Sequence, residues 1–237
     1  MDGSHALLTL QERDTELDQL RYRRAHLPER AHLDTVLSEL AAVGSAGAAV
    51  SAQREELGRR QAQLETELAE TERRLAVINR QMRSGAITAS RDLQAMADQV
   101  EGLERRRSNL EDAELEVLEA LDPVDAEVGA LQGRWVELDG EASRLRGEVA
   151  EAEVALDGQV ATVAALRERA VALVSAGLLV TYERLRGRLG GVGAAPLVGA
   201  SCGGCHLTLS ASELDRARRL PPDAVVTCDQ CGRILVR

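Results

Sequence analysis

Apolar residues recur with a seven-residue period along most of this chain. With Leu33 at position a, eleven of the fifteen a and d positions from Leu33 to Met82 are apolar. A second register runs from Leu93 to Leu173 without a phase shift, and 21 of its 24 a and d positions are apolar. A sustained seven-residue repeat is typical of helices that pack along a coiled-coil seam. The pattern therefore predicts two long helices.

A short polar segment separates the two registers. Residues 84–90 read Ser-Gly-Ala-Ile-Thr-Ala-Ser, which is turn chemistry. Two long helices joined by such a turn fold back as an antiparallel hairpin with its tip at 84–91. With the turn centred near Ile87, residue i of the first arm faces about residue 174 − i of the second. We expect the exposed tip residues Gly85, Ile87 and Thr88 to be candidates for partner contact.

The N-terminal residues complete the hairpin. Leucines at 10, 17, 20 and 27 form a seven-residue pattern in a different phase from that of the first arm. We expect this segment to pair with residues 147–174 of the second arm, which the first arm leaves without a partner. Pro28 lies where the phase changes and is typical of a first helical position, so we expect a break near 27–28. Pro123, in the pair 122–123, lies within the unbroken seam of the second arm and predicts a kink in that helix. The hairpin is expected to span 1–189.

A small domain follows the helices. Residues 190–196 contain three glycines and a proline, which predicts a linker. We expect the last domain at 197–237, with strands at 206–209, 225–227 and 233–236. Ser210 and Glu213 form a capping-box pattern that opens a helix ending near Leu220. The fold class is thus mainly α, a long antiparallel coiled-coil hairpin with a small C-terminal domain.

Composition and charge support this architecture and restrict the function. The chain has no Phe, one Trp and two Tyr, so it lacks the large rings that fill most globular cores. Its net charge is −10, which disfavours general binding to nucleic acid phosphates. No apolar run approaches the length of a membrane span, and we expect no membrane contact. Thiols kept as metal ligands fit a reducing compartment, so we expect a cytoplasmic protein.

The four cysteines carry the most specific chemical signal. They form two C-x-x-C pairs, Cys202 with Cys205 and Cys228 with Cys231, separated by 22 residues. This spacing predicts a four-thiolate zinc site that holds one structural ion, in a domain too small to be stable alone. A site closed by four thiolates has no position for a substrate water, and we expect no enzyme activity. A dithiol redox pair, an iron site with the same ligands, and His206 as a ligand in place of Cys205 are the alternatives.

Two kinds of partner remain open. The acidic hairpin and the closed metal site favour a non-enzymatic adaptor that binds proteins, and further pairing of hairpins into a homodimer is possible. The alternative is a nucleic-acid-binding regulator that contacts RNA or DNA through its C-terminal domain. The arginines that would make these contacts are Arg216, Arg218, Arg219 and Arg233.

Several segments together resemble a known bacterial family. Residues 198–209 (VGASCGGCHLTL) and 227–235 (TCDQCGRIL) are similar to its two cysteine motifs, and 7–14 and 91–93 also look like that family. The family consists of coiled-coil hairpin proteins with a C-terminal four-cysteine zinc ribbon. The resemblance implies this architecture and the four zinc ligands. Some members are linked to flagellar or secretion regulation, as adaptors for an alternative sigma factor or export components, and one branch is linked to RNA.

Overall fold

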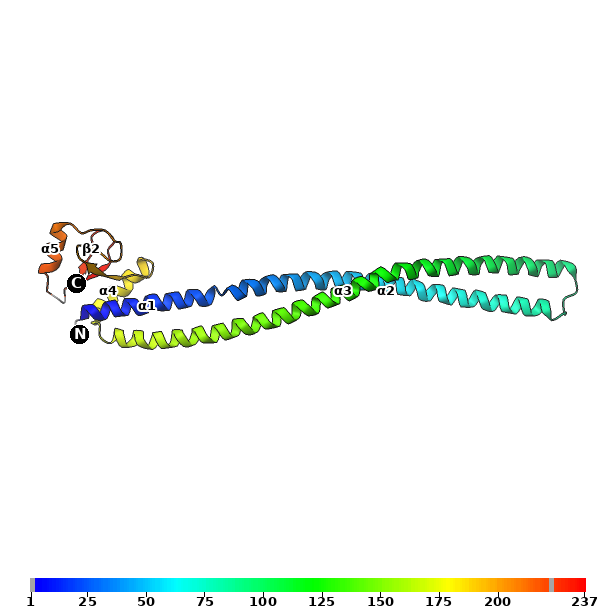
Figure 1. Cartoon of the computed structure of the whole chain (residues 1–237), viewed down its shortest axis with the longest axis horizontal. Helices are drawn as coiled ribbons and strands as arrows, with labels where there is room; N and C mark the ends of the chain where they lie inside the picture. Colours follow the sequence, from blue (N-terminus) through cyan, green and yellow to red (C-terminus); the bar gives the residue numbers. More distant parts are fainter. Residues whose placement is uncertain (1–2, 222–223) are drawn as a thin grey trace. The chain divides into compact units, whose positions relative to one another are not determined.

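The chain is mainly helical, with a small sheet near its C-terminus (Figure 1). A computed structural model describes residues 3–221 and 224–237. The helices are α1 (Gly3–Ala25), α2 (Pro28–Arg83), α3 (Ser90–Val171), α4 (Ala176–Arg188) and α5 (Ala211–Arg219). The strands are β1 (Ala194–Val198), β2 (Ser201–Cys202), β3 (Val226–Thr227) and β4 (Ile234–Val236). The predicted fold class is confirmed.

The chain divides into two compact units, which are described separately. One unit is Leu33–Arg144, and the other combines Met1–His32 with Leu145–Arg237. The second unit therefore contains the C-terminal domain together with α1, α4 and the end of α3. The expected boundaries of the hairpin at 1–189 and of the last domain at 197–237 stay a prediction.

The unit Leu33–Arg144 is the antiparallel pairing of α2 with α3. Arg134 donates a hydrogen bond to Glu39 (3.0 Å) and Arg106 to Glu67 (3.3 Å), close to the facing positions expected for a turn near Ile87. Leucines and valines of both arms are buried along the seam; these are Val36, Leu64, Leu75, Leu110, Val124 and Leu138. Helix α3 continues through Pro123. A kink at 122–123 stays a prediction.

In the other unit, α1 packs on the end of α3. Leu17 and Leu20 of α1 form a buried cluster with Leu156 and Val163 of α3. The N-terminal segment therefore covers the part of the second arm that the first arm leaves without a partner. Helix α1 ends at Ala25 and α2 begins at Pro28, which is where the phase of the heptad changes.

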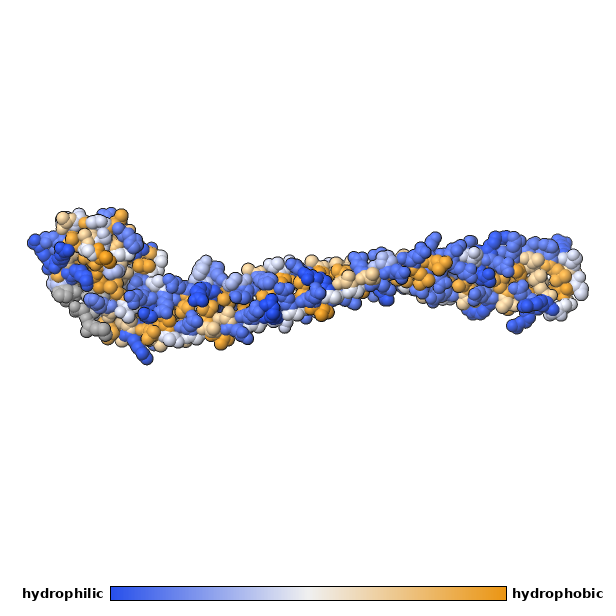
Figure 2. Space-filling model, in the orientation of Figure 1, coloured by the Kyte–Doolittle hydropathy of each residue, from blue (hydrophilic) through white to orange (hydrophobic). Residues whose placement is uncertain are grey.

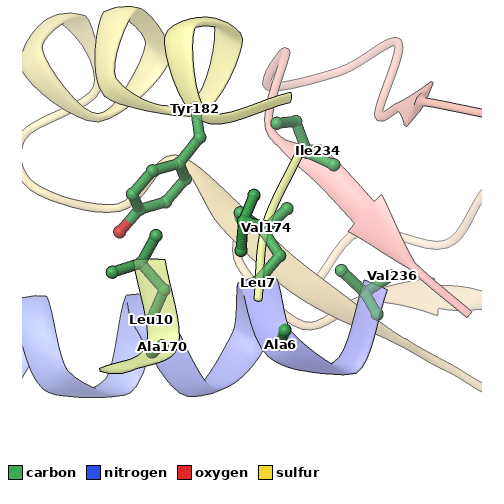
Figure 3. Packing of buried hydrophobic residues seen from close by; sticks show 9 residues of the cluster. Ala6, Leu7, Leu10, Ala170, Val174, Tyr182, Ile234 and Val236 are labelled. Atoms are coloured by element: carbon green, nitrogen blue, oxygen red, sulfur yellow. The ribbon is translucent and has the colours of Figure 1, made fainter. Parts of the chain in front are cut away.

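Helix α4 follows a short turn and joins the helices to the sheet. Its Tyr182 is fully buried and points toward α1 (Figure 3). It belongs to a cluster that combines α1 and α3 with the first and last strands; the members are Ala6, Leu7, Leu10, Ala170, Val174, Tyr182, Ala194, Ile234 and Val236. The sheet is therefore part of one core with the helices, which explains why they form one unit.

The sheet differs in part from the sequence prediction. Its strand order is β2-β1-β4-β3, with β1 parallel to β4 and antiparallel to β2. Strands β3 and β4 lie within the predicted 225–227 and 233–236, but 206–209 forms only an isolated bridge at Thr208. Residues 194–196, expected in the linker, belong to β1. Glycine and proline obscured this strand, because they usually interrupt regular structure.

One helical stretch is apolar enough to cross a membrane when judged only by length and composition. It lies within His5–Arg83 and contains an 18-residue window with a mean hydropathy of 1.3. The expectation that no apolar run approaches this length is therefore wrong on this measure. Residues 40–53 explain the difference, because they contain no charged side chain. One such window is by itself weak evidence for a membrane segment.

Candidate metal centre

Each cysteine pair lies in a tight turn with the same backbone hydrogen bonds. In the first turn, the amide of His206 donates to the carbonyl of Cys202 (2.8 Å), and the amide of Cys202 donates to Leu207 (3.0 Å). His206 has a φ of 62°, in the left-handed region. Histidine tolerates this conformation better than most residues with a side chain.

The second turn repeats this arrangement. The amide of Gly232 donates to the carbonyl of Cys228 (2.7 Å), and the amide of Cys228 donates to Arg233 (2.9 Å). Gly232 has a φ of 74°, which glycine adopts without strain. The residue after each C-x-x-C pair thus reverses the chain, and both turns direct their cysteines toward one point.

The four sulfur atoms fit a tetrahedral zinc site. All four lie within 4.8 Å of one another, with 3.8 Å between Cys202 Sγ and Cys231 Sγ and 3.9 Å between Cys205 Sγ and Cys228 Sγ. A tetrahedron with Zn–S bonds of about 2.3 Å has edges of about 3.8 Å. A disulfide would need a separation of about 2.05 Å. The sulfurs are therefore placed as four separate ligands around a single ion.

The surroundings shift the pKa values of the cysteine thiols in different directions. Burial raises the pKa of Cys202 and raises that of Cys228 to about 12. Burial also acts on Cys231, but hydrogen bonds, first that from the Arg233 backbone, outweigh it and lower its pKa to about 7. A bound divalent cation favours the thiolate at every one of these positions.

The two glycines of the first turn are required by close packing. A Cβ at Gly203 would lie 2.9 Å from the carbonyl oxygen of Pro196. A Cβ at Gly204 would lie 2.6 Å from Cδ of Arg233 and 3.0 Å from Cβ of Ala195. The C-G-G-C sequence therefore lets this turn lie directly against β1.

His206 has a structural place beside the turn. Its side chain is exposed, and the clustered metal-ligating atoms are the four cysteine sulfurs. This geometry does not support His206 as a ligand in place of Cys205. A four-sulfur set suits zinc, while a redox dithiol needs only one reactive pair.

Gln11 of α1 connects the metal-binding domain to the helices. Its side chain is buried, and its Oε1 accepts hydrogen bonds from the amides of Gly193 (2.7 Å) and Ala194 (3.3 Å). Its Nε2 donates to the carbonyl of Gly191 (3.0 Å) and to Thr15 (3.0 Å). Gln11 thereby provides hydrogen-bond partners for backbone amide and carbonyl groups at the point where the chain enters β1.

Asp14, one turn further along α1, is a second buried polar contact. Tyr182 donates its hydroxyl proton to Asp14 (2.6 Å), and Arg167 donates from Nε to the other carboxylate oxygen (2.6 Å). Burial, and then the hydrogen bond to Asp14, raise the pKa of the Tyr182 hydroxyl. Arg167 also contacts Glu183 of α4. Gln11 and Asp14 lie in the segment 7–14 that resembles the family, but their roles depend on residues more than 150 positions away in the chain.

Most of the predicted arginine contacts are occupied within the molecule. Arg216 binds both carboxylate oxygens of Asp229 (3.0 and 2.8 Å), and Arg219 pairs with Asp215 (2.8 Å). Arg233 is half-buried and donates to the carbonyls of Val192 (3.1 Å) and Leu189 (3.4 Å). Arg218 is exposed on α5. The four side chains therefore do not form one open basic surface.

The tip residues lie in the loop between α2 and α3. Gly85 has a φ of 68° and turns the chain. Thr88 is exposed, and Ile87 is half-buried. The loop therefore presents few large apolar groups of its own.

Comparisons with known proteins agree with this architecture. Residues 10–190 match the model of the CT398-like coiled coil hairpin domain, and residues 201–235 match that of the C4-type zinc ribbon domain. An uncharacterized protein of Mycobacterium tuberculosis is 31% identical over 239 residues, which covers 98% of this chain and 94% of that protein.

Two solved structures extend the likeness to three dimensions. A protein from Mycobacterium smegmatis has a TM-score of 0.87 at 31% identity, over 99% of this chain and 97% of that one. CT398 from Chlamydia trachomatis has a TM-score of 0.72 at 17% identity, with the same coverage, and this shows a shared fold.

Proposed function

We propose that this chain, which belongs to the CT398-like coiled-coil hairpin family and carries a C4-type zinc ribbon, is a non-enzymatic adaptor that binds other proteins. Its C-terminal domain would be a docking head, and one structural zinc ion would hold that head in shape. Cys202, Cys205, Cys228 and Cys231 would bind the ion as thiolates. The four thiolates occupy the whole tetrahedral shell, so the ion would stabilise the fold and activate no water.

The exposed apolar side chains of the zinc ribbon support this proposal most directly. Val198 is 63% exposed, Leu207 is 53% exposed and Val225 is 48% exposed. Val198 is the last residue of β1, Leu207 follows the first cysteine turn, and Val225 directly precedes β3. Apolar side chains on a rigid surface are typical of protein interaction sites. Figure 2 shows hydrophobic surface on this domain.

Nucleic acid binding is the second candidate, and the structure offers it less support. It would need Arg216, Arg219 and Arg233, which instead contact Asp229, Asp215 and backbone carbonyls. Breaking these contacts would oppose phosphate binding. We therefore propose a protein partner, and a second copy of this chain is one candidate. The four thiols support a cytoplasmic location, since they stay reduced there.

Affinity capture from native extract tests the adaptor function. The bait is the full-length zinc-loaded chain, compared with a double variant, Val198→Ser with Leu207→Ser. The control is Val154→Ser on α3, where the side chain is 73% exposed but lies outside the ribbon. We expect the double variant to lose specific protein partners that the control retains.

Nuclease treatment separates the two candidates. Partners that remain bound to the full chain after treatment, and are lost from the double variant, support the adaptor. Identical partner sets for all three baits contradict it. Partners that disappear with nuclease alone favour the nucleic-acid alternative.

A further inference from the structure

The tip of the hairpin carries concentrated positive charge. Residues 73–91 include no aspartate or glutamate and five arginines, here called the tip cluster: Arg73, Arg74, Arg80, Arg83 and Arg91. The rest of the chain has 24 basic residues against 39 acidic ones. The overall net charge of −10 therefore conceals a local charge of +5 at the tip.

Four of these arginines have no carboxylate partner. Arg74 pairs with Glu70, but over residues 3–221 and 224–237 no carboxylate lies within 4.0 Å of the other four guanidinium groups. Arg73 and Arg83 use Nε to donate to carbonyls of their own helix, at 3.0 and 3.1 Å. Their remaining N–H groups are available, and all five side chains are exposed.

An apolar groove lies beside the tip cluster. It has a volume of about 540 Å³ and is lined by Val77 and Ile78 of α2 and by Gly102 and Leu103 of α3, together with Arg73 and Arg74. Val77 is 52% exposed, although a valine on a coiled coil is normally in the seam. Gly102 borders open space, because a Cβ there would meet no atom within 4 Å. In this unit, Figure 2 shows hydrophobic surface next to hydrophilic surface.

The arginines and the groove share one face of α2. Arg73, Val77 and Arg80 have i, i+4, i+7 spacing, which places them in one row. The two arginines are seven residues apart, or about 10.5 Å along the helix. The surface thus offers an apolar contact with one cation a turn before it and another a turn after it.

We propose that this tip surface binds an amphipathic helix of a partner protein, with two acidic residues seven positions apart and apolar residues between them. This inference deepens the adaptor function and rests on it. The partner's apolar residues enter the groove against Val77 and Leu103, and its carboxylates pair with Arg73 and Arg80. Packing of a helix into the groove between two antiparallel helices is a common recognition mode.

The surface fits a helix better than a nucleic acid. Residues 73–103 contain no aromatic side chain, so no base could stack there. Glu70 and Glu72 precede the tip cluster, and Asp92 and Asp98 follow it. A long chain of phosphates would meet these carboxylates, whereas a short helix fits between them.

A designed peptide tests the proposal on the full-length chain. The probe is a fluorescent alanine-based helix of about 18 residues, with two glutamates seven positions apart and leucines at the third and fourth positions between them. Fluorescence anisotropy measures its Kd. Two control peptides replace the glutamates with glutamine or the leucines with serine, and we expect both to bind at least tenfold more weakly.

Matched variants of the chain locate the site. The double variant Arg73→Gln with Arg80→Gln is expected to raise Kd at least tenfold. Gly102→Gln fills the groove and should abolish binding, while its better helix propensity preserves the fold. The controls Arg60→Gln and Gly58→Gln lie elsewhere on α2, and Gly58 has no atom within 4 Å of an added Cβ. Both should bind like the unchanged chain.

Other results would overturn the proposal. One is an unchanged Kd for Gly102→Gln, and another is no binding of the probe by the unchanged chain. A third is binding of oligouridylate RNA or phosphatidylserine vesicles that is tighter than binding of the peptide and depends on the arginines but not on Gly102. If the peptide fails while capture through Val198 and Leu207 holds, only the tip surface is refuted. If the peptide binds specifically and that capture fails, the tip surface stands and the ribbon docking head is refuted.

Discussion

Replacing Gln11 with methionine is expected to weaken the attachment of the zinc ribbon to the helices without leaving a cavity. Methionine has nearly the same volume and only a weakly polar sulfur. The change removes the acceptor for the amides of Gly193 (2.7 Å) and Ala194 (3.3 Å). It also removes the donor to the carbonyl of Gly191 (3.0 Å). Gln11 itself is only 7% exposed, so water does not easily replace it.

The size of the effect follows from how many of these groups stay buried. A buried backbone group that loses its partner costs about 1–3 kcal/mol. Gly193 and Ala194 are buried, whereas Gly191 is half-buried and can bind water. Two unsatisfied amides therefore lower the free energy of detaching the ribbon by about 3 kcal/mol. Since about 1.4 kcal/mol is a factor of ten, the detached state becomes about 150 times more populated.

Hydrogen exchange with mass spectrometry measures this population directly. With zinc kept saturating, we expect exchange in β1 and β4 to rise about a hundredfold, and exchange within Leu33–Arg144 to stay unchanged. Gln19→Met is the control, because Gln19 lies on the same helix with an exposed side chain. Exchange in β1 that stays within threefold of the unchanged chain would refute the assigned role of Gln11.

Five further substitutions test other parts of the same unit. Cys228→Ser should abolish zinc binding, measured by metal analysis, and unfold the ribbon while most of the helical circular dichroism remains; loss of the whole helical signal would contradict this. Gly193→Ala places a Cβ 2.8 Å from the carbonyl oxygen of Tyr182 and should destabilise the unit by about 2–3 kcal/mol in thermal unfolding. Gly187→Ala, with no atom within 4 Å, should instead stabilise it by up to about 1 kcal/mol. His206→Gly should keep one zinc per chain and match or exceed the original stability, because φ is 62° at this position. His206→Val should instead lose about 1–2 kcal/mol of stability. Loss of zinc in His206→Gly would identify the imidazole as a ligand.

Local patterns predicted much of this fold. The heptad positions indicated both long helices, and the phase change at Pro28 coincides with the break between α1 and α2. The capping box was correct, since Ser210 Oγ accepts from the amide of Glu213 (3.3 Å) and Glu213 accepts from the amide of Ser210 (2.6 Å). These features depend on residues within a few turns of one another, so the sequence shows them directly.

Strand β1 could not be predicted in the same way. Its residues 194–198 include Pro196 and follow three glycines, which made the segment resemble a linker. It becomes a strand because it pairs with β4, about 40 residues later, and its buried Ala194 enters the core with α1 and α4. A long-range pairing of this kind outweighs local propensity.

Local patterns were enough to predict the hairpin, its tip and the four zinc ligands, because heptad periodicity and C-x-x-C spacing can be read from neighbouring residues of the chain. Folding alone brings the zinc ribbon and the helices into one core, where Ala194, Ile234 and Val236 pack with Leu7 and Tyr182. It also forms the groove of Val77 and Gly102 beside the tip cluster. These relations depend on which distant side chains meet after folding, and no local pattern records that.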